Sequence, residues 1–178
     1  MCGGRGTRLD APVEKSLFEV DGRPMVDHVH DALRASRCES VHAVGSPDTP
    51  ATRDHWEGAY LEAPGDGYVA DLQYALERVD TPVLTVATDL PLLGGDAVDA
   101  VLDAHDGGSL TVAVPAALKR RLGVSTDTTT TYEGREVAPT GLNVVVPGDH
   151  GDTYLTYDAR LAVNVNRPGD ATVAAEFL

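Results

Sequence analysis

Short apolar runs alternate with amphipathic stretches along this chain, and this alternation constrains the fold more than any other feature. The clearest run, Pro82 to Ala87, has six uncharged residues rich in β-branched side chains, which is typical of a strand buried on both faces of a sheet. The stretch 24–36 spaces its apolar residues along one helix face. Strands that alternate with helices favour an α/β fold with a mostly parallel sheet between two helical layers.

The same patterns predict the other elements. Strands are expected at 16–20, 41–44, 110–114, 141–146 and 162–166, and helices at 49–56, from 66 or 67 onward, at 95–104 and at 168–178. A loop or weak strand is expected at 126–131. Because 178 residues suit one well-buried domain, we expect residues 1–178 to form a single three-layer α/β/α domain with a Rossmann-like sheet.

Acidic residues dominate the charge. Aspartate and glutamate number 28 against 14 lysines and arginines, and only Lys15 and Lys119 are lysines. This composition indicates a halophilic protein, because concentrated salt screens the repulsion of an acidic surface; an acidic protein of no special habitat is the alternative. Such a surface argues against nucleic-acid binding. Without a membrane-length apolar run or a signal sequence, the protein is expected to be cytoplasmic, with no stable membrane insertion.

The glycine-rich N-terminal segment is the first candidate site. Gly3, Gly4 and Gly6 would let backbone N–H groups approach phosphate oxygens closely. Arg8 and Lys15 add cationic donors for a triphosphate and for charge that builds on leaving pyrophosphate. The spacing matches neither the Walker A pattern nor the dinucleotide fingerprint. A flexible tail is the alternative, but the retention of Lys15 in a lysine-poor chain favours a functional loop.

The strand that should lead into this loop is largely missing. A phosphate-binding loop normally lies between a strand and a helix, and only Met1 and Cys2 precede the glycines. Either the start of the chain is placed too late or a central strand is truncated, and we expect the former.

A carboxylate follows the strand 82–87. Asp89 would lie at the carboxyl end of that strand, where α/β sheets collect ligands. A lone carboxylate suits Mg²⁺, which also takes phosphate oxygens and water. Asn164 and Asn166 would point to the same face of their strand, so that Asn166 could supply a second oxygen. A turn cap at Asp89 and an ordinary strand-end asparagine are the alternatives.

Two further loops are candidate ligand contacts. Gly65 and Gly67 bracket a tight loop, and Asp71 beyond it could accept hydrogen bonds from N1 and N2 of guanine. Gly141, followed by Asn143, would allow a sugar or acceptor group to approach closely. A plain loop and a bulge explain these two segments equally well from spacing alone.

The motif Gly3-Gly-x-Gly-Thr-Arg8, followed by Glu14-Lys15, resembles the nucleotidyltransferase superfamily, which includes molybdenum-cofactor guanylyltransferases and sugar-phosphate nucleotidylyltransferases. A finer resemblance, over nearly the whole chain, is to the archaeal GTP:adenosylcobinamide-phosphate guanylyltransferases. It rests on Ser46-Pro-Asp-Thr-Pro-Ala-Thr52, Gly65-Asp-Gly-Tyr-Val-Ala-Asp-Leu72, Thr88-Asp-Leu90, Ala138-Pro-Thr-Gly-Leu-Asn-Val-Val145 and Asn164-Val-Asn166. Members of this group usually begin with an apolar strand, and read Glu-Lys-Pro where this chain has Glu14-Lys15-Ser16.

The resemblance implies a nucleotidyltransferase fold and an Mg²⁺-dependent enzyme of cobalamin biosynthesis and salvage. GTP would be the co-substrate and a corrinoid phosphate the acceptor, giving adenosylcobinamide-GDP and pyrophosphate. Arg8, Lys15 and Asp89 would be catalytic, with Asp89 and Asn166 as metal ligands. The implied nucleotide-binding residues are Gly3, Gly4, Gly6, Thr7, Arg8, Lys15, Gly65, Gly67, Tyr68, Asp71, Asp89, Gly141 and Asn143.

Two other functions remain open at this point. A molybdopterin guanylyltransferase or a sugar-phosphate nucleotidylyltransferase would keep the chemistry and change the acceptor. A non-catalytic nucleotide-binding domain would bind GTP without releasing pyrophosphate. The oligomeric state is also open, with a homodimer as one option.

Overall fold

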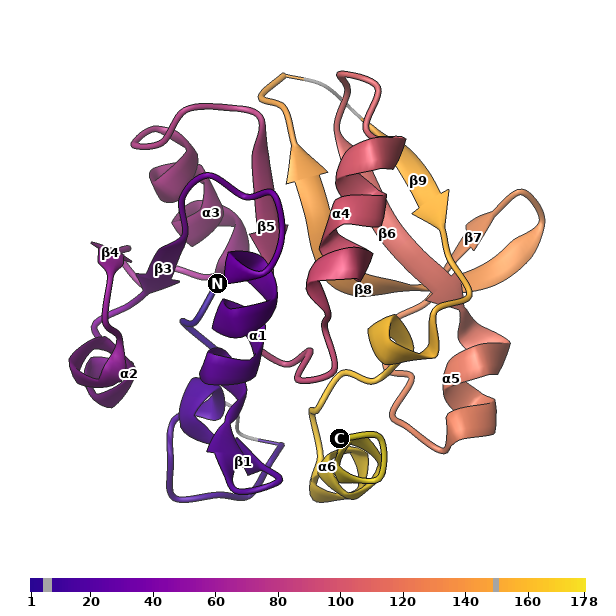
Figure 1. Ribbon diagram of the computed structural model, residues 1–178, viewed down its shortest axis with the longest axis horizontal. Helices are drawn as coiled ribbons and strands as arrows, with labels where there is room; N and C mark the ends of the chain where they lie inside the picture. Colours follow the sequence, from indigo (N-terminus) through magenta and orange to yellow (C-terminus); the bar gives the residue numbers. More distant parts are fainter. Residues whose placement is uncertain (5–7, 149–150) are drawn as a thin grey trace.

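Two sheets and a small hairpin carry the helices in the computed structural model, which describes residues 1–4, 8–148 and 151–178 (Figure 1). The smaller sheet pairs β3 (His42–Gly45) in parallel with β4 (Ala59–Glu62). The larger sheet orders β5 (Val83–Val86), β8 (Arg135–Val145), β6 (Leu110–Pro115) and β9 (Asp152–Leu155), with β7 (Thr130–Tyr132) also on β8. The hairpin joins β1 (Glu19–Val20) to β2 (Arg23–Pro24).

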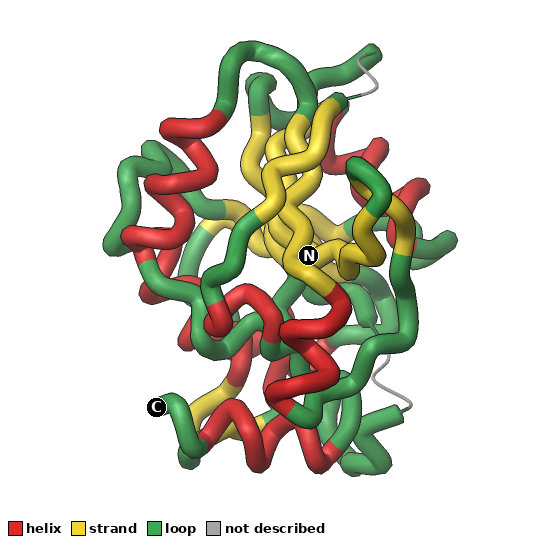
Figure 2. The backbone as a smooth tube through the Cα atoms, turned by 90° about the vertical axis from the view of Figure 1, so that its right-hand side faces the viewer, coloured by secondary structure: helices red, strands yellow, loops and turns green. Residues whose placement is uncertain are grey.

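Strand direction in the larger sheet is mostly uniform. β8 pairs antiparallel with β5, β6 and β7, whereas β6 pairs parallel with β9. Consequently β5, β6, β7 and β9 share one direction and β8 opposes them. Turned by 90°, the molecule shows these strands gathered in its upper half, with helices and loops around and below them (Figure 2).

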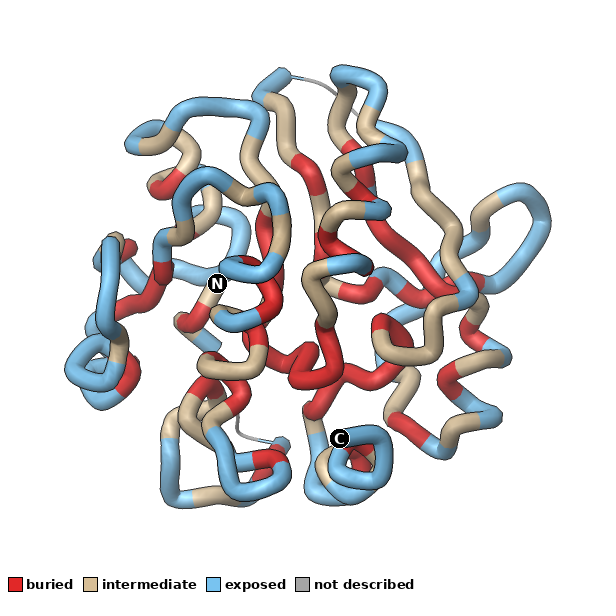
Figure 3. The backbone as a smooth tube through the Cα atoms, viewed as in Figure 1, coloured by how far each residue is buried: buried red, intermediate tan, exposed pale blue. Residues whose placement is uncertain are grey.

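Helices cover both faces of the sheets. Helices α1 (Met25–Arg34) and α4 (Gly95–Ala104) pack on β6 and β8 in the main core. In β3, Ala43 packs with α1, while the next residue, Val44, packs with α3 (Tyr68–Leu76). Because neighbouring strand residues point to opposite faces, the two helices lie on opposite sides of β3. The buried residues follow β5, β6 and β8 and continue into the segments below them (Figure 3), which gives the expected α/β sandwich.

The shorter helices surround this core. These are α2 (Pro50–His55), α5 (Ala116–Leu122) and α6 (Pro168–Ala175), together with the 3₁₀ turns η1 (Lys15–Leu17) and η2 (Ala159–Ala162). Within the described ranges, no helix has both the length and the apolar character needed to cross a membrane.

Met1 and Cys2 lie between the two sheets. The Met1 amino group donates to the Val86 carbonyl at 2.8 Å, and the Cys2 N–H donates to the Val44 carbonyl at 2.6 Å. Beside them a groove of about 780 Å³ runs between β3 and β5, lined by apolar side chains that include Leu61 and Leu84. Met1 and Cys2 therefore occupy the end of a strand position between β3 and β5.

Several sequence predictions need correction. Residues 162–166 are not a strand: η2 ends at Ala162, and residues 163–166 belong to none of the sheets. The expected strand 16–20 is reduced to β1, because η1 precedes it. The strand expected at 141–146 begins earlier, at Arg135.

The elements that the sequence predictions missed include β4, α5 and β9. Helix α5 could have been found, since its Ala, Leu, Lys and Arg residues are strong helix formers. Gly123, with a φ of 76°, ends it in the usual left-handed conformation.

Candidate functional site

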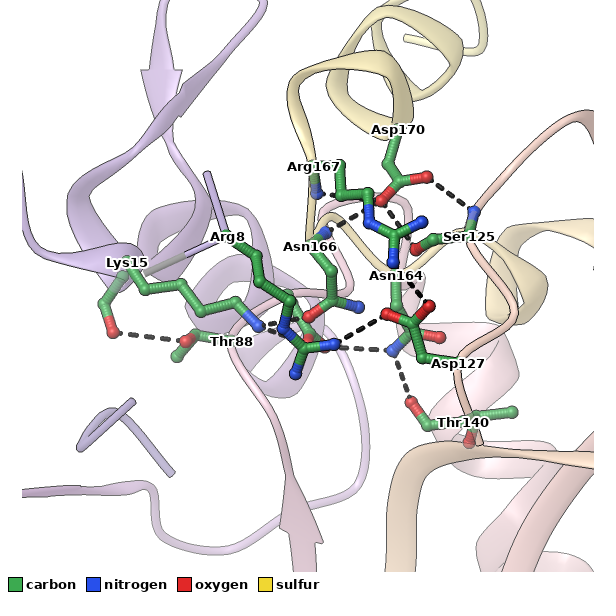
Figure 4. A network of polar contacts seen from close by, with 12 residues as sticks. Arg8, Lys15, Thr88, Ser125, Asp127, Thr140, Asn164, Asn166, Arg167 and Asp170 are labelled. Atoms are coloured by element: carbon green, nitrogen blue, oxygen red, sulfur yellow. Dashed lines mark hydrogen bonds and ion pairs between the residues drawn. The ribbon is translucent and has the colours of Figure 1, made fainter. Parts of the chain in front are cut away.

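Lys15 connects two residues that the sequence predicts as metal ligands (Figure 4). Its Nζ donates to Asp89 Oδ2 at 2.7 Å and to Asn166 Oδ1 at 2.8 Å. The Lys15 and Asp89 side chains are only 16% and 12% exposed. Lys15 comes from η1, Asp89 follows β5 and Asn166 precedes α6, so three distant parts of the chain meet here. The two oxygens converge on one point, as a cation site requires.

The residues flanking Lys15 are fixed from both sides. The Glu14 carboxylate accepts from the N–H groups of Ala51 at 2.8 Å and Thr52 at 2.7 Å, at the N-terminus of α2, where a negative charge is favourable. Ser16 Oγ donates to the Cys2 carbonyl at 3.2 Å and shares a 3.1 Å hydrogen bond with Thr88 Oγ1. Ser16, a departure from the proline of the resembling family, thus ties η1 to the end of β5.

Asn164 holds the other side of Asp89. Its Nδ2 donates to Asp89 Oδ1 at 2.9 Å and to the Thr140 carbonyl at 2.7 Å, and its Oδ1 accepts from Lys119 Nζ at 2.9 Å. The Asp89 carbonyl accepts from the Val165 N–H at 2.8 Å. The 162–166 segment is therefore attached to Asp89 at its backbone and side chain, although it is not a strand.

Asp170 positions Asn166 and was missed in the sequence. This buried carboxylate accepts from the N–H groups of Asn166 at 3.0 Å and Arg167 at 2.9 Å, and from Ser125 N–H at 2.7 Å. As the third residue of α6, Asp170 accepts from the N–H of the N-cap residue Arg167, which is the reciprocal contact of a capping box. An aspartate two residues after Pro168 is a helix-start signal that could have revealed it.

The loop expected to meet the base lies next to the glycine segment. Asp71 is buried, and its Oδ1 accepts from the Gly65 N–H at 2.8 Å. A Cβ atom on Gly3 would lie 3.6 Å from Asp71 Oδ2. Gly65 and Gly67 have φ angles of 85° and 108°, which favour glycine. One Asp71 oxygen thus holds the loop and the other faces Gly3.

Tyr68, also assigned to nucleotide binding, begins α3 and is half exposed. Among the described residues, no hydrogen bond links its hydroxyl to the Lys15 cluster, so its assignment stays a prediction.

The remaining members of the glycine segment are divided. A Cβ atom on Gly4 would lie 3.6 Å from Lys15 Cδ, which places Gly4 beside the cluster. Arg8 instead donates to Asp127 at 2.6 Å, with 61% of its side chain exposed, and Arg167 donates to the same carboxylate at 2.7 Å (Figure 4). Gly6 and Thr7 lie outside the described residues.

Gly141 lies near the cluster and Asn143 does not. Gly141 has a φ of 86°, and a Cβ atom there would lie 3.1 Å from Ala87 Cβ and 3.9 Å from Asn164 Nδ2. It therefore allows β8 to approach the end of β5. Asn143 pairs with Thr85 of β5 and with Thr111 of β6, away from that end.

The donor set fits a hard cation. Asp89 supplies a carboxylate oxygen and Asn166 an amide oxygen, the ligand types that Mg²⁺ takes together with phosphate oxygens and water. Among residues 1–4, 8–148 and 151–178, no three His, Cys, Asp or Glu side chains gather as a metal site. A metal at Asp89 would accordingly need oxygens from a bound substrate.

An α/β sandwich with Lys15, Asp89 and Asn166 gathered beyond the end of β5 fits a nucleotidyltransferase. Residues 1–167 match the MobA-like NTP transferase domain, and the chain belongs to that family.

Two relatives illustrate the family. An adenosylcobinamide-phosphate guanylyltransferase from Methanocaldococcus jannaschii is 29% identical over 196 residues, which cover 100% of this chain and 95% of the relative. The bifunctional protein GlmU from an Exiguobacterium species is 30% identical, and the match covers 100% of this chain but 38% of that protein. Among solved structures, CMP:2-keto-3-deoxy-manno-octonic acid synthetase complexed with CTP has the same fold, with a TM-score of 0.64 over 96% of this chain and 95% of that one, at 13% identity.

Proposed function

We propose that this protein transfers GMP from GTP to adenosylcobinamide phosphate, giving adenosylcobinamide-GDP and pyrophosphate, in cobalamin biosynthesis and salvage. The observation that carries the proposal is the convergence of Lys15, Asp89 and Asn166. The acceptor is assigned by similarity to the Methanocaldococcus jannaschii guanylyltransferase, which spans the whole chain.

The reaction is a direct displacement at the α-phosphorus. An oxygen of the acceptor phosphate forms a bond to that phosphorus while the bond to the bridging oxygen of the β-phosphate breaks, and pyrophosphate leaves. With no covalent enzyme intermediate, the enzyme contributes positioning and charge neutralisation. Lys15 would donate to the phosphate that gains charge. Arg8, which is exposed and pairs with the surface carboxylate of Asp127, would turn to the leaving pyrophosphate.

Asp89 and Asn166 would hold Mg²⁺, which when bound supplies positive charge to the phosphate oxygens. In the structure, the Lys15 ammonium lies between the Asp89 and Asn166 oxygens and neutralises the Asp89 charge. Asp170 and Asn164 keep the two ligands in place through the hydrogen bonds described above.

Guanine selection is assigned to Asp71. Its Oδ1 keeps the 65–71 loop closed, while Oδ2 faces the glycine segment and is available to accept from guanine N1 and N2. Adenine presents no matching pair of donors at those positions. Gly65, Gly67 and Tyr68 would line the base, and Gly141 would leave room beside the acceptor.

The proposed setting is a salt-rich cytoplasm, in keeping with the net charge of −14. We also propose that residues 1–178 act as one domain. The Met1 and Cys2 hydrogen bonds to both sheets support that assignment.

Pyrophosphate release tests the function. Reactions in molar KCl with Mg²⁺ would offer GTP with adenosylcobinamide phosphate, and in parallel ATP with the same acceptor and GTP with molybdopterin or a sugar phosphate. Release should need GTP and the cobinamide acceptor together, should be lost in Asp89→Asn, and should persist in Asp106→Asn, a control at an exposed aspartate. Release with molybdopterin or a sugar phosphate would instead identify a molybdopterin guanylyltransferase or a sugar-phosphate nucleotidylyltransferase. Saturable GTP binding without pyrophosphate release would favour a non-catalytic domain.

A further inference from the structure

Lys119 is a buried cation that the proposed reaction does not use. It lies in α5 and is 4% exposed. Its Nζ donates to the Ala162 carbonyl at 2.7 Å and to Asn164 Oδ1 at 2.9 Å, and it has no carboxylate within direct ion-pair distance among the described residues. Burial lowers the pKa of Lys119, while the charge of Asp89 acts in the opposite direction. An ammonium placed this deeply is costly, and an apolar residue there would avoid the cost.

The contacts of Lys119 determine which way the Asn164 amide points. An ammonium group donates hydrogen bonds and accepts none, so Asn164 must present Oδ1 to Lys119. Its Nδ2 is then directed at Asp89 Oδ1 and at the Thr140 carbonyl, at 2.9 and 2.7 Å. With the amide reversed, the Asn164 NH₂ group would face the Lys119 ammonium, donor against donor. The amide oxygen would then face Asp89 Oδ1 and the Thr140 carbonyl, both of which are acceptors.

This orientation divides the two oxygens of Asp89 between two tasks. Oδ1 is held by Asn164, and Oδ2 faces Lys15, which also binds Asn166. The carboxylate therefore cannot rotate without losing a hydrogen bond on its inner side. The outer oxygen stays directed at the point where the Asn166 oxygen converges.

Lysine usage agrees with this arrangement. The chain has two lysines, and both act on Asp89, Lys15 directly and Lys119 through Asn164. The planar guanidinium of arginine, which the chain uses at its other basic Lys/Arg positions, differs in shape and donor geometry from a compact ammonium buried as deeply as that of Lys119.

We propose that Lys119 is a positioning residue for the metal site: through the Asn164 amide it fixes the Asp89 carboxylate with Oδ2 directed at the cation. This inference rests on the proposed function for its metal, although it concerns binding and not the identity of the acceptor.

Mn²⁺ affinity measured by electron paramagnetic resonance, in the presence of GTP and without acceptor, tests the proposal. Lys119→Met should weaken Mn²⁺ binding by about 10–100-fold, the range typical for residues that support metal ligands. Arg121→Met is the matched control, because it removes an exposed cation from the same helix, and it should leave the affinity unchanged. Circular dichroism of each variant would verify the fold.

Asn164→Ala gives an independent arm, because it removes the link and keeps Lys119. It should weaken Mn²⁺ binding to a similar extent, and the double variant should be no worse than the single ones, since both changes act through one contact. Unchanged Mn²⁺ affinity in a folded Lys119→Met or Asn164→Ala variant would overturn the proposal, as would fully additive losses. Wild-type protein that binds Mn²⁺ and GTP but transfers nothing to the cobinamide acceptor would refute the function alone.

Discussion

Replacing Lys15 by methionine removes the ammonium between Asp89 and Asn166 and keeps a side chain of similar length. In the structure, this ammonium makes hydrogen bonds of 2.7 and 2.8 Å to the two oxygens. Without it, Asn164 is the one side-chain donor that the described part of the chain leaves to the Asp89 carboxylate. The change therefore leaves a nearly buried charge partly unpaired.

The size of the effect follows from burial. Hydrogen bonds to charged groups contribute about 1.5–3 kcal/mol each, and breaking a fully buried ion pair costs about 3–5 kcal/mol. Because the Lys15 and Asp89 side chains remain 16% and 12% exposed, water recovers part of the loss. We expect Lys15→Met to lower the free energy of unfolding by about 2–3 kcal/mol, or Tm by roughly 5–10 °C in a chain of this length.

Thermal unfolding followed by circular dichroism, at fixed KCl and without nucleotide, provides the assay. The Arg121→Met control should shift Tm little, as surface changes do. A Tm equal to that of the control would refute this reasoning about the cluster.

Three further predictions concern other parts of the molecule. Asp71→Asn keeps an acceptor for the Gly65 N–H but loses the charge, so the GTP preference over ATP in kcat/KM should fall by about 10–100-fold; an unchanged ratio would exclude Asp71 from base selection. Arg160 lowers the pKa of the Asp158 carboxyl, so its stabilising effect is present above the unfolded pKa of that group and is lost as pH falls through the folded one. Urea unfolding should therefore show Arg160→Leu less stable than wild type near neutral pH, with the two converging in acid; a pH-independent difference would contradict this. An apolar strand-forming segment added before Met1 should fill the groove of about 780 Å³ and raise Tm above that of a Gly/Ser extension of equal length; equal Tm values would oppose it.

Periodicity and strand ends gave the sequence analysis its strongest predictions. The helix at 95–104 has the bounds of α4, and the buried strand before Asp89 is β5. The 162–166 segment shows the limit of such reasoning. Asn164 and Asn166 both reach the Lys15–Asp89 cluster, but periodicity carries no information about backbone pairing in a sheet, and the described residues form none there.

The supporting residues of the site were beyond reach for a different reason. Lys119 reaches the site through Asn164, 45 positions away in the sequence. The sequence identifies Glu14 only as the residue before Lys15, because its role at the N-terminus of α2 depends on how η1 packs. Local patterns do not encode these tertiary contacts.

The most direct test of the central claim is to follow each phosphorus of GTP. The protein would be incubated in molar KCl with Mg²⁺, adenosylcobinamide phosphate and GTP labelled at either the α- or the γ-phosphorus, and the corrinoid product would be separated. Guanylyl transfer predicts that the α-label enters the corrinoid and the γ-label appears in pyrophosphate. Label from the γ-phosphorus in the corrinoid, or a corrinoid without label from either position, would contradict the proposed reaction.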